Sequence, residues 1–157
     1  MMRQKFAEFI YTRMLTDSQL IVVTADLGMG MFDKISKVFP DRFVNYGAAE
    51  MGALAFCVGL SYQGYKPIFY SITPFALWRP AEVIRNYLNH EQAKVLIAAS
   101  GRDSQYEHDG FSHFAGDAPD LIKLFPAINY YEPTEENIYE TTGRALNNLP
   151  AIISLSR

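Results

Sequence analysis

The sequence of 157 residues has few of the residues that build metal and disulfide sites: one cysteine and three histidines. A single cysteine excludes an intrachain disulfide framework and a cysteine-rich metal site. Cys57 lies in the apolar run LAFCVGL, which favours a small core residue over a nucleophile. Because such cysteine usage is typical of a reducing compartment, we expect a cytoplasmic protein.

Clusters of one charge and long apolar runs are also missing. The formal net charge of -3 comes from interspersed acids and bases, and no basic cluster could track along the phosphates of a nucleic acid. Residues 1–15 are amphipathic but charged throughout, which fits neither a signal peptide nor a membrane span. We therefore expect neither a nucleic acid nor a membrane as a partner.

The residues that are present predict one compact domain over 1–157, because 49% of them are hydrophobic. Short apolar runs, typical of strands, alternate with segments that have helical periodicity. Strands are predicted at 19–26, 42–46, 66–72, 94–100, 127–133 and 150–156, and helices at 3–16, 32–39, 49–64, 80–92, 119–125 and 134–148. Pro80 is expected at the start of one helix, Thr134 as the N-cap of another, and Gly64 at the end of a third.

This alternation predicts an α/β fold: a doubly wound, mostly parallel sheet of about six strands with helices on both faces. Ligands of such sheets bind beyond the carboxyl ends of the strands. Asp26 and the segments 46–50, 73–79 and 101–118 each follow a predicted strand. We expect them to gather at one rim.

Glu50 is the only acid between residues 45 and 67, in a stretch of small and apolar residues. An ionised carboxylate is costly to bury without a partner. Glu50 therefore either faces solvent, is matched by a partner, or serves chemistry. An acid in the first turn of a helix is also stabilised by the helix dipole, with no chemistry involved.

Six segments carry a resemblance to a known family: TADLG, NYGAAEMGA, SITPFALWR, HDGFSHFAGD, YYEPTEEN and PAIISLSR. Their order and spacing resemble the pyrimidine-binding domain of transketolase-like thiamine diphosphate-dependent enzymes. That group includes transketolase, deoxyxylulose phosphate synthase and the β subunits of 2-oxoacid dehydrogenases. The resemblance extends from about residue 5 to Arg157.

The resemblance implies a role for Glu50 toward the cofactor. In the family, the carboxylate at this position hydrogen-bonds N1′ of the aminopyrimidine and favours the tautomer that deprotonates the thiazolium carbon. Phe75, or else Trp78, would stack on the pyrimidine; the family pattern fits either with a one-residue shift, and ordinary core packing is the alternative for both. Asp26 resembles an acid near the cofactor and the partner subunit, with a loop cap as its alternative. Arg79 is out of register with the basic residue of deoxyxylulose phosphate synthase.

The segment HDGFSH resembles a substrate loop of the family. By position, Asp109 would hydrogen-bond a sugar hydroxyl, and His113 would shuttle a proton at the oxygen of the donor substrate. Gly110 would provide the positive φ that a tight loop needs. A polar surface loop without function is the alternative.

Members of the family have a GDG motif followed by an asparagine, and together these hold the metal ion that binds the diphosphate. This sequence lacks the motif. The segment GDA at 116–118 lacks its last glycine. The resemblance therefore implies that this chain has no metal site and that a separate diphosphate-binding subunit holds Mg²⁺ or Ca²⁺. It also implies that the diphosphate-binding and C-terminal domains lie outside this chain.

The leading interpretation is a subunit of a split thiamine diphosphate-dependent transketolase-like transferase acting on a ketose. We expect a homodimer core within a hetero-oligomer. One alternative is a split 2-oxoacid decarboxylase or dehydrogenase subunit. Another is a non-catalytic interaction or regulatory protein that keeps the fold.

Overall fold

The computed structural model describes residues 1–157 and contains one sheet of six parallel strands in the order β2-β1-β3-β4-β6-β5. The strands are β1 (Leu20–Thr24), β2 (Phe43–Asn45), β3 (Lys66–Ile72), β4 (Leu96–Ser100), β5 (Asn129–Tyr131) and β6 (Ala151–Leu155). Every residue of β1, β4 and β6 is buried, as expected for strands covered on both faces. The predicted fold class is confirmed.

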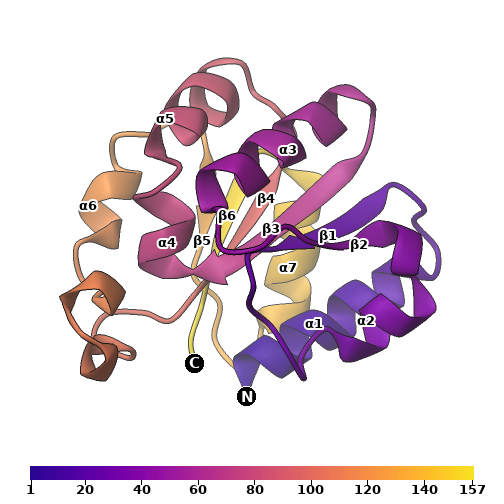
Figure 1. Ribbon diagram of the computed structural model, residues 1–157, viewed down its shortest axis with the longest axis horizontal. Helices are drawn as coiled ribbons and strands as arrows, with labels where there is room; N and C mark the ends of the chain where they lie inside the picture. The colour runs from indigo at the N-terminus through magenta and orange to yellow at the C-terminus, as the bar shows by residue number, and fades with distance from the viewer.

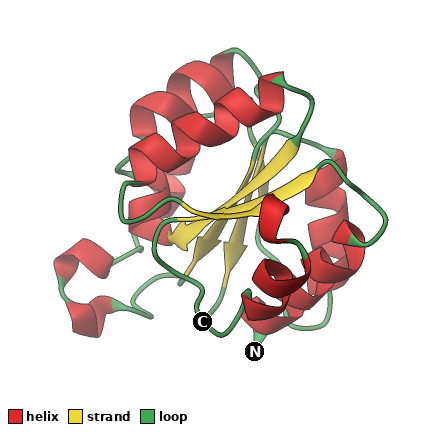
Figure 2. Ribbon diagram, turned by 45° about the vertical axis from the view of Figure 1, so that its right-hand side comes forward, coloured by secondary structure: helices red, strands yellow, loops and turns green.

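Helices cover both faces of this sheet (Figures 1 and 2). One face carries α3 (Glu50–Tyr62), α4 (Thr73–Leu77), α5 (Ala81–Val83) and α6 (Ala118–Ile122), and the other carries α1 (Met2–Met14), α2 (Asp33–Val38) and α7 (Ile138–Asn147). Each face has its own apolar core. None of the helices combines the length and the apolarity that crossing a membrane requires.

Helix α3 positions the candidate acid at its first residue, and its sequence explains where it ends. It begins at Glu50 and ends where Gly64 adopts φ +87°, a conformation that glycine takes without strain. The Gly64 amide donates to the carbonyl of Ser61 at 3.1 Å. Cys57 lies on the inner face of α3 and is fully buried, and burial raises the pKa of its thiol. It is an inert core residue rather than a nucleophile.

The expected N-cap at Thr134 is wrong. Helix α7 begins at Ile138, and Asn137 is its N-cap residue. The Asn137 side-chain oxygen accepts from the Thr134 amide at 2.8 Å and from the Thr141 hydroxyl at 3.3 Å. The asparagine thus closes its own turn before the helix starts, which leaves Thr134 in the loop.

Four other segments differ in detail from the predicted elements. Residues 73–79 contain the short helix α4, and the predicted helix 80–92 consists of α5, with Pro80 at its N-cap, and a π-helical segment, η2 (Ile84–His90). The predicted loop 101–118 contains two 3₁₀ turns, η3 (Glu107–Asp109) and η4 (Phe111–His113), which project away from the sheet in Figure 2. A third 3₁₀ turn, η1 (Pro40–Arg42), precedes β2.

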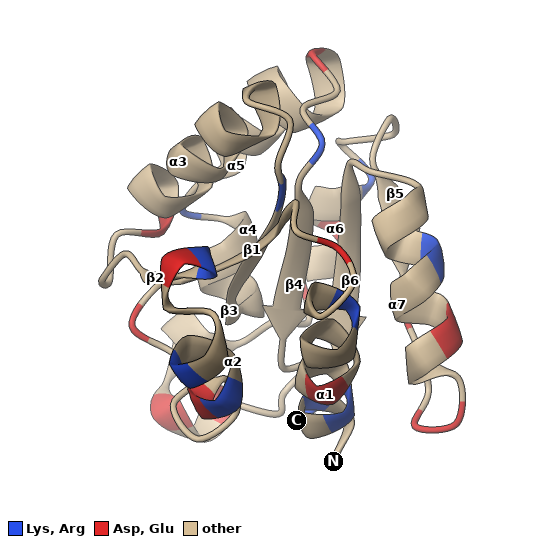
Figure 3. Ribbon diagram, turned by 90° about the vertical axis from the view of Figure 1, so that its right-hand side faces the viewer, with Lys and Arg blue, Asp and Glu red and all other residues tan.

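Because all strands are parallel, the segments after β1, β2, β3 and β4 share one rim of the sheet, as expected. Both chain ends lie close together on one side of the molecule (Figures 1 and 2). Figure 3 shows acidic and basic residues intermixed on α1 and α2.

Candidate active site

Glu50 is the buried acid of this rim. It is 3% exposed, and both of its carboxylate oxygens lie 2.7 Å from Nη1 of Arg79, which donates to them. Arg79 comes just after α4, from the segment that follows β3. Of the three situations that the sequence allows for Glu50, the structure shows a matched partner. Its place at the N-terminus of α3 adds the favourable helix dipole.

The arginine also lies on an aromatic ring. Its guanidinium carbon is 3.6 Å from the ring centroid of Phe75, which is one helical turn earlier. The Phe75 ring also packs against His113 in a T-shaped arrangement, with the two ring centroids 5.0 Å apart and an interplanar angle of 63°. Glu50, Arg79, Phe75 and His113 therefore form one row of contacts, from the start of α3 to the 3₁₀ turns.

A cleft of about 420 Å³ opens beside this row. Its lining residues come from the α4 segment and from the loop after β4: Pro74, Phe75, Trp78, Arg79, Phe111, Ser112, Phe114 and Asp117. Trp78 is 47% exposed, and its indole N–H donates to Asp117 at 3.4 Å. Both aromatic candidates, Phe75 and Trp78, thus face one mostly apolar cleft.

Gly110 separates the two 3₁₀ turns and has φ +101°, as predicted for the tight loop. The His113 amide donates to the Gly110 carbonyl at 2.9 Å, and the Ser112 hydroxyl lies 3.0 Å from His113 Nδ1. This backbone places Asp109 and His113 on the same side of the loop, where both line a second cavity.

The second cavity, of about 440 Å³, lies between the start of α1, the loop after β1, and the 3₁₀ turns. Asp109 and His113 line it together with Arg3, Tyr70 and Tyr106. Nη1 of Arg3 donates to the Tyr106 hydroxyl at 2.8 Å, and burial raises the pKa of Tyr70, so its hydroxyl stays neutral.

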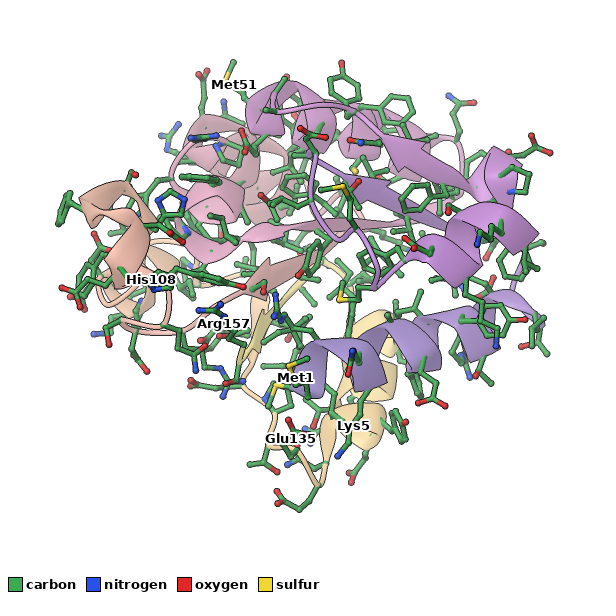
Figure 4. The ribbon with its side chains drawn as sticks, turned by 60° about the horizontal axis from the view of Figure 1, so that its bottom comes forward. Met1, Lys5, Met51, His108, Glu135 and Arg157 are labelled. Atoms are coloured by element: carbon green, nitrogen blue, oxygen red, sulfur yellow. The ribbon has the colours of Figure 1, made fainter.

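Met1 and His108 are labelled in Figure 4. Met1, at the start of α1, is one of the residues that line the second cavity. His108 lies on the loop, with Nε2 3.4 Å from the carboxylate of Asp109, and both side chains are half exposed. His108 lines neither cavity. Of this pair, only Asp109 lines the second cavity.

Glu50 lines neither cavity but contacts Arg79 of the first one, whereas Asp26 lies apart from both. It is exposed, has φ +55°, and its amide donates to the Asn45 side chain at 2.9 Å. These contacts join the loop after β1 to the end of β2. No group of three or more His, Cys, Asp or Glu side chains is arranged to hold a metal ion.

The structure adds two arginines that sequence reasoning did not place in the site, Arg79 and Arg3. The signal for Arg79 was present: it is the first base after β3, it can reach the start of α3 on the same face, and a buried acid there requires a partner. Nothing in the sequence pointed to a site role for Arg3. Helical periodicity places it in the first turn of α1 but does not say what its side chain reaches.

Comparisons with known proteins find matches along the whole chain. The family model "Transketolase, pyrimidine binding domain" matches residues 1–157. A putative transketolase C-terminal section from Methanocaldococcus jannaschii is 29% identical over 135 residues, which cover 85% of this chain and 43% of that protein. The 1-deoxy-D-xylulose-5-phosphate synthase of Treponema pallidum is 28% identical over 134 residues, covering 83% of this chain and 20% of that enzyme.

Among solved structures, a split gene transketolase described as an inactive β4 tetramer superposes with a TM-score of 0.86. It is 26% identical, and the match covers 99% of this chain and 51% of that one. The chain spans less than half the length of the curated relatives it matches.

Proposed function

Because this chain belongs to the family of transketolase pyrimidine-binding domains, we propose that it is a subunit of a split, thiamine diphosphate-dependent transketolase-like enzyme. The observation that carries the proposal is the buried carboxylate of Glu50 beside an aromatic cleft at the rim of the sheet. An aminopyrimidine is a flat ring with a weakly basic nitrogen. A buried acid and the face of Phe75 fit both properties.

The chain's own residues would act on the cofactor by position. When bound, thiamine diphosphate supplies a nucleophilic carbon that attacks a carbonyl group. Glu50 would hold a proton at the pyrimidine ring nitrogen, and its low exposure would keep water away from that proton. Phe75 would orient the ring by stacking, with Trp78 as the second aromatic candidate. Asp26 stays a predicted contact toward the partner subunit.

His113 borders the Phe75 ring and lines the second cavity, which suits a substrate site next to the cofactor site. His113 would move a proton at the oxygen of the donor substrate, and Asp109 would accept a hydrogen bond from a sugar hydroxyl. The guanidinium of Arg3 suits a phosphate or carboxylate at the far end of the substrate. A ketose uses all three groups, whereas a 2-oxoacid leaves Asp109 without a hydroxyl to bind.

A diphosphate-binding subunit would hold the Mg²⁺ or Ca²⁺ and complete the site. The split gene transketolase that is similar to this chain is an inactive tetramer in its solved form, which supports the need for a second subunit. Exposed apolar side chains near the start of α3, Tyr46, Met51 and Phe56, support contacts with other chains. We propose a homodimer core within a hetero-oligomer.

One observation favours a second candidate, a non-catalytic interaction protein. The pair of Glu50 and Arg79 satisfies the buried acid by itself, so the fold has a use for Glu50 without a cofactor. Retention of Asp109 and His113 beside the cavity favours the enzyme instead.

The test of the proposed function is reconstitution. The chain is mixed with a diphosphate-binding transketolase subunit, thiamine diphosphate and Mg²⁺, and ketol transfer is measured. We expect transfer by the mixture and none by either chain alone, because each holds only half of the site. Calorimetry should show weak cofactor binding by the isolated chain. Micromolar binding by the isolated chain would contradict the proposal, and an inactive mixture would support the interaction protein.

Two substitutions decide which aromatic residue stacks on the pyrimidine. In the assembled enzyme, Phe75→Leu should raise the apparent KM for thiamine diphosphate about tenfold, since a stacked aromatic pair contributes about 0.5–1.5 kcal/mol. Trp78→Leu should raise it less than about threefold, because half of the indole faces solvent. The reverse order of the two KM values would move the stacking role to Trp78.

A further inference from the structure

The guanidinium of Arg79 makes the two contacts that an aminopyrimidine would need: it donates to Glu50 and lies over the ring of Phe75. We propose that Arg79 occupies the pyrimidine position in the cofactor-free chain, so that the cofactor and Arg79 compete for the same two groups. The inference rests on the proposed function, because it takes the aminopyrimidine as the ligand of Glu50.

Chemical similarity is the first argument. A guanidinium is planar, delocalised and weakly hydrated, and it stacks on aromatic rings while it donates to a carboxylate. A protonated N1′ of the aminopyrimidine presents one planar N–H donor to the carboxylate, as Nη1 of Arg79 does. Arg79 therefore resembles the proposed ligand in shape and in its hydrogen bonding to Glu50.

Exclusion of the ligand is the second argument. The guanidinium carbon lies 3.6 Å from the Phe75 centroid, which is a van der Waals distance, so no ring fits between the two groups. Both oxygens of Glu50 accept from Arg79, and the residue is 3% exposed. A pyrimidine cannot reach the carboxylate or this face of Phe75 unless Arg79 leaves.

Arg79 is free to leave, and Glu50 is not. The Arg79 side chain is 46% exposed, and its only hydrogen bonds and ion pair are those to Glu50. It can swing into solvent about its own side-chain bonds. Glu50 belongs to α3, whose inner face is packed in the core. The buried acid would thus exchange one planar donor for another and never stand unpaired.

The competition predicts that removal of Arg79 strengthens ligand binding. The test is an NMR titration of the full chain with thiamine, which has the aminopyrimidine but no diphosphate. We expect Arg79→Met to lower the Kd for thiamine about tenfold relative to wild type, equivalent to about 1.4 kcal/mol. The matched control is Arg85→Met, an exposed arginine of the following helical segment that should leave the Kd unchanged.

A weaker or unchanged affinity of Arg79→Met for thiamine would overturn the proposal. It would mean that Arg79 contributes to thiamine binding or has no effect on it. A second variant, Arg79→Lys, covers the case in which Arg79→Met does not fold. It keeps a positive charge beside Glu50 but loses the planar guanidinium over Phe75, and it should lower the Kd for thiamine about threefold. In the wild-type chain, saturation with thiamine should move the chemical shift of the Arg79 Nε–H to the value of a solvent-exposed arginine. A signal that stays in place at saturation would also overturn it.

Failure of the inference can be told from failure of the proposed function. If wild type binds thiamine and Arg79→Met binds no more tightly, only the competition is wrong. If no variant shifts at saturating thiamine and the reconstituted mixture is inactive, both fail together. Glu50→Gln combined with Arg79→Met should lose the gain in affinity, since the amide cannot share a proton with the ring nitrogen.

Discussion

In the reconstituted enzyme, Glu50→Gln should lower kcat for ketol transfer by at least about 10²-fold, the usual contribution of a positioned proton-transfer group. Glutamine has the same shape, so the packing of α3 stays intact. Its amide cannot hold an exchangeable proton at the pyrimidine nitrogen, and Arg79 loses its charged partner. The measurement is steady-state kcat at saturating thiamine diphosphate and Mg²⁺.

The matched control for this substitution is Glu82→Gln. Glu82 is an exposed acid of α5 that lines neither cavity, so its replacement should leave kcat unchanged. Thermal unfolding of both variants should show that the Glu50→Gln chain is folded. If it keeps wild-type kcat, Glu50 has no role in activating the cofactor, and its pair with Arg79 is purely structural.

The fold was predictable because burial and periodicity act locally. Residues 66–72 were predicted as a strand and form β3 with the same bounds, since an apolar run lies between Gly64 and the start of α4. Parallel order followed from strands that are apolar on both faces. The rim position of Glu50 then needed only the rule that the ends of parallel strands meet at one edge.

The details that escaped prediction depend on choices between side chains. Glu50 and Arg79 are 29 positions apart, and periodicity does not say which base reaches a buried acid. Thr134 has a good N-cap side chain, but Asn137 forms its own turn and starts α7 later. Residues 84–90 have helical periodicity, which cannot distinguish a π-helix from an α-helix.

His113→Asn should lower kcat of the reconstituted enzyme about 10²-fold and change the KM for thiamine diphosphate less than about twofold. Asparagine fills a similar space and keeps a hydrogen-bonding group, but it cannot accept and return a proton. The control is His108→Asn on the same loop. His108 lines neither cavity and does not contact Phe75, so kcat should stay within about twofold of wild type.

The ratio of the two kinetic effects separates two roles of His113. The His113 ring contacts the Phe75 ring. If His113 only supports Phe75, its substitution would disturb the surface on which the pyrimidine stacks. In that case His113→Asn would raise the KM for thiamine diphosphate and leave kcat at saturating cofactor unchanged. A proton shuttle gives the opposite pattern, because the proton moves only after the substrate is bound. A change confined to KM would therefore remove His113 from the chemistry and leave it as a support for Phe75.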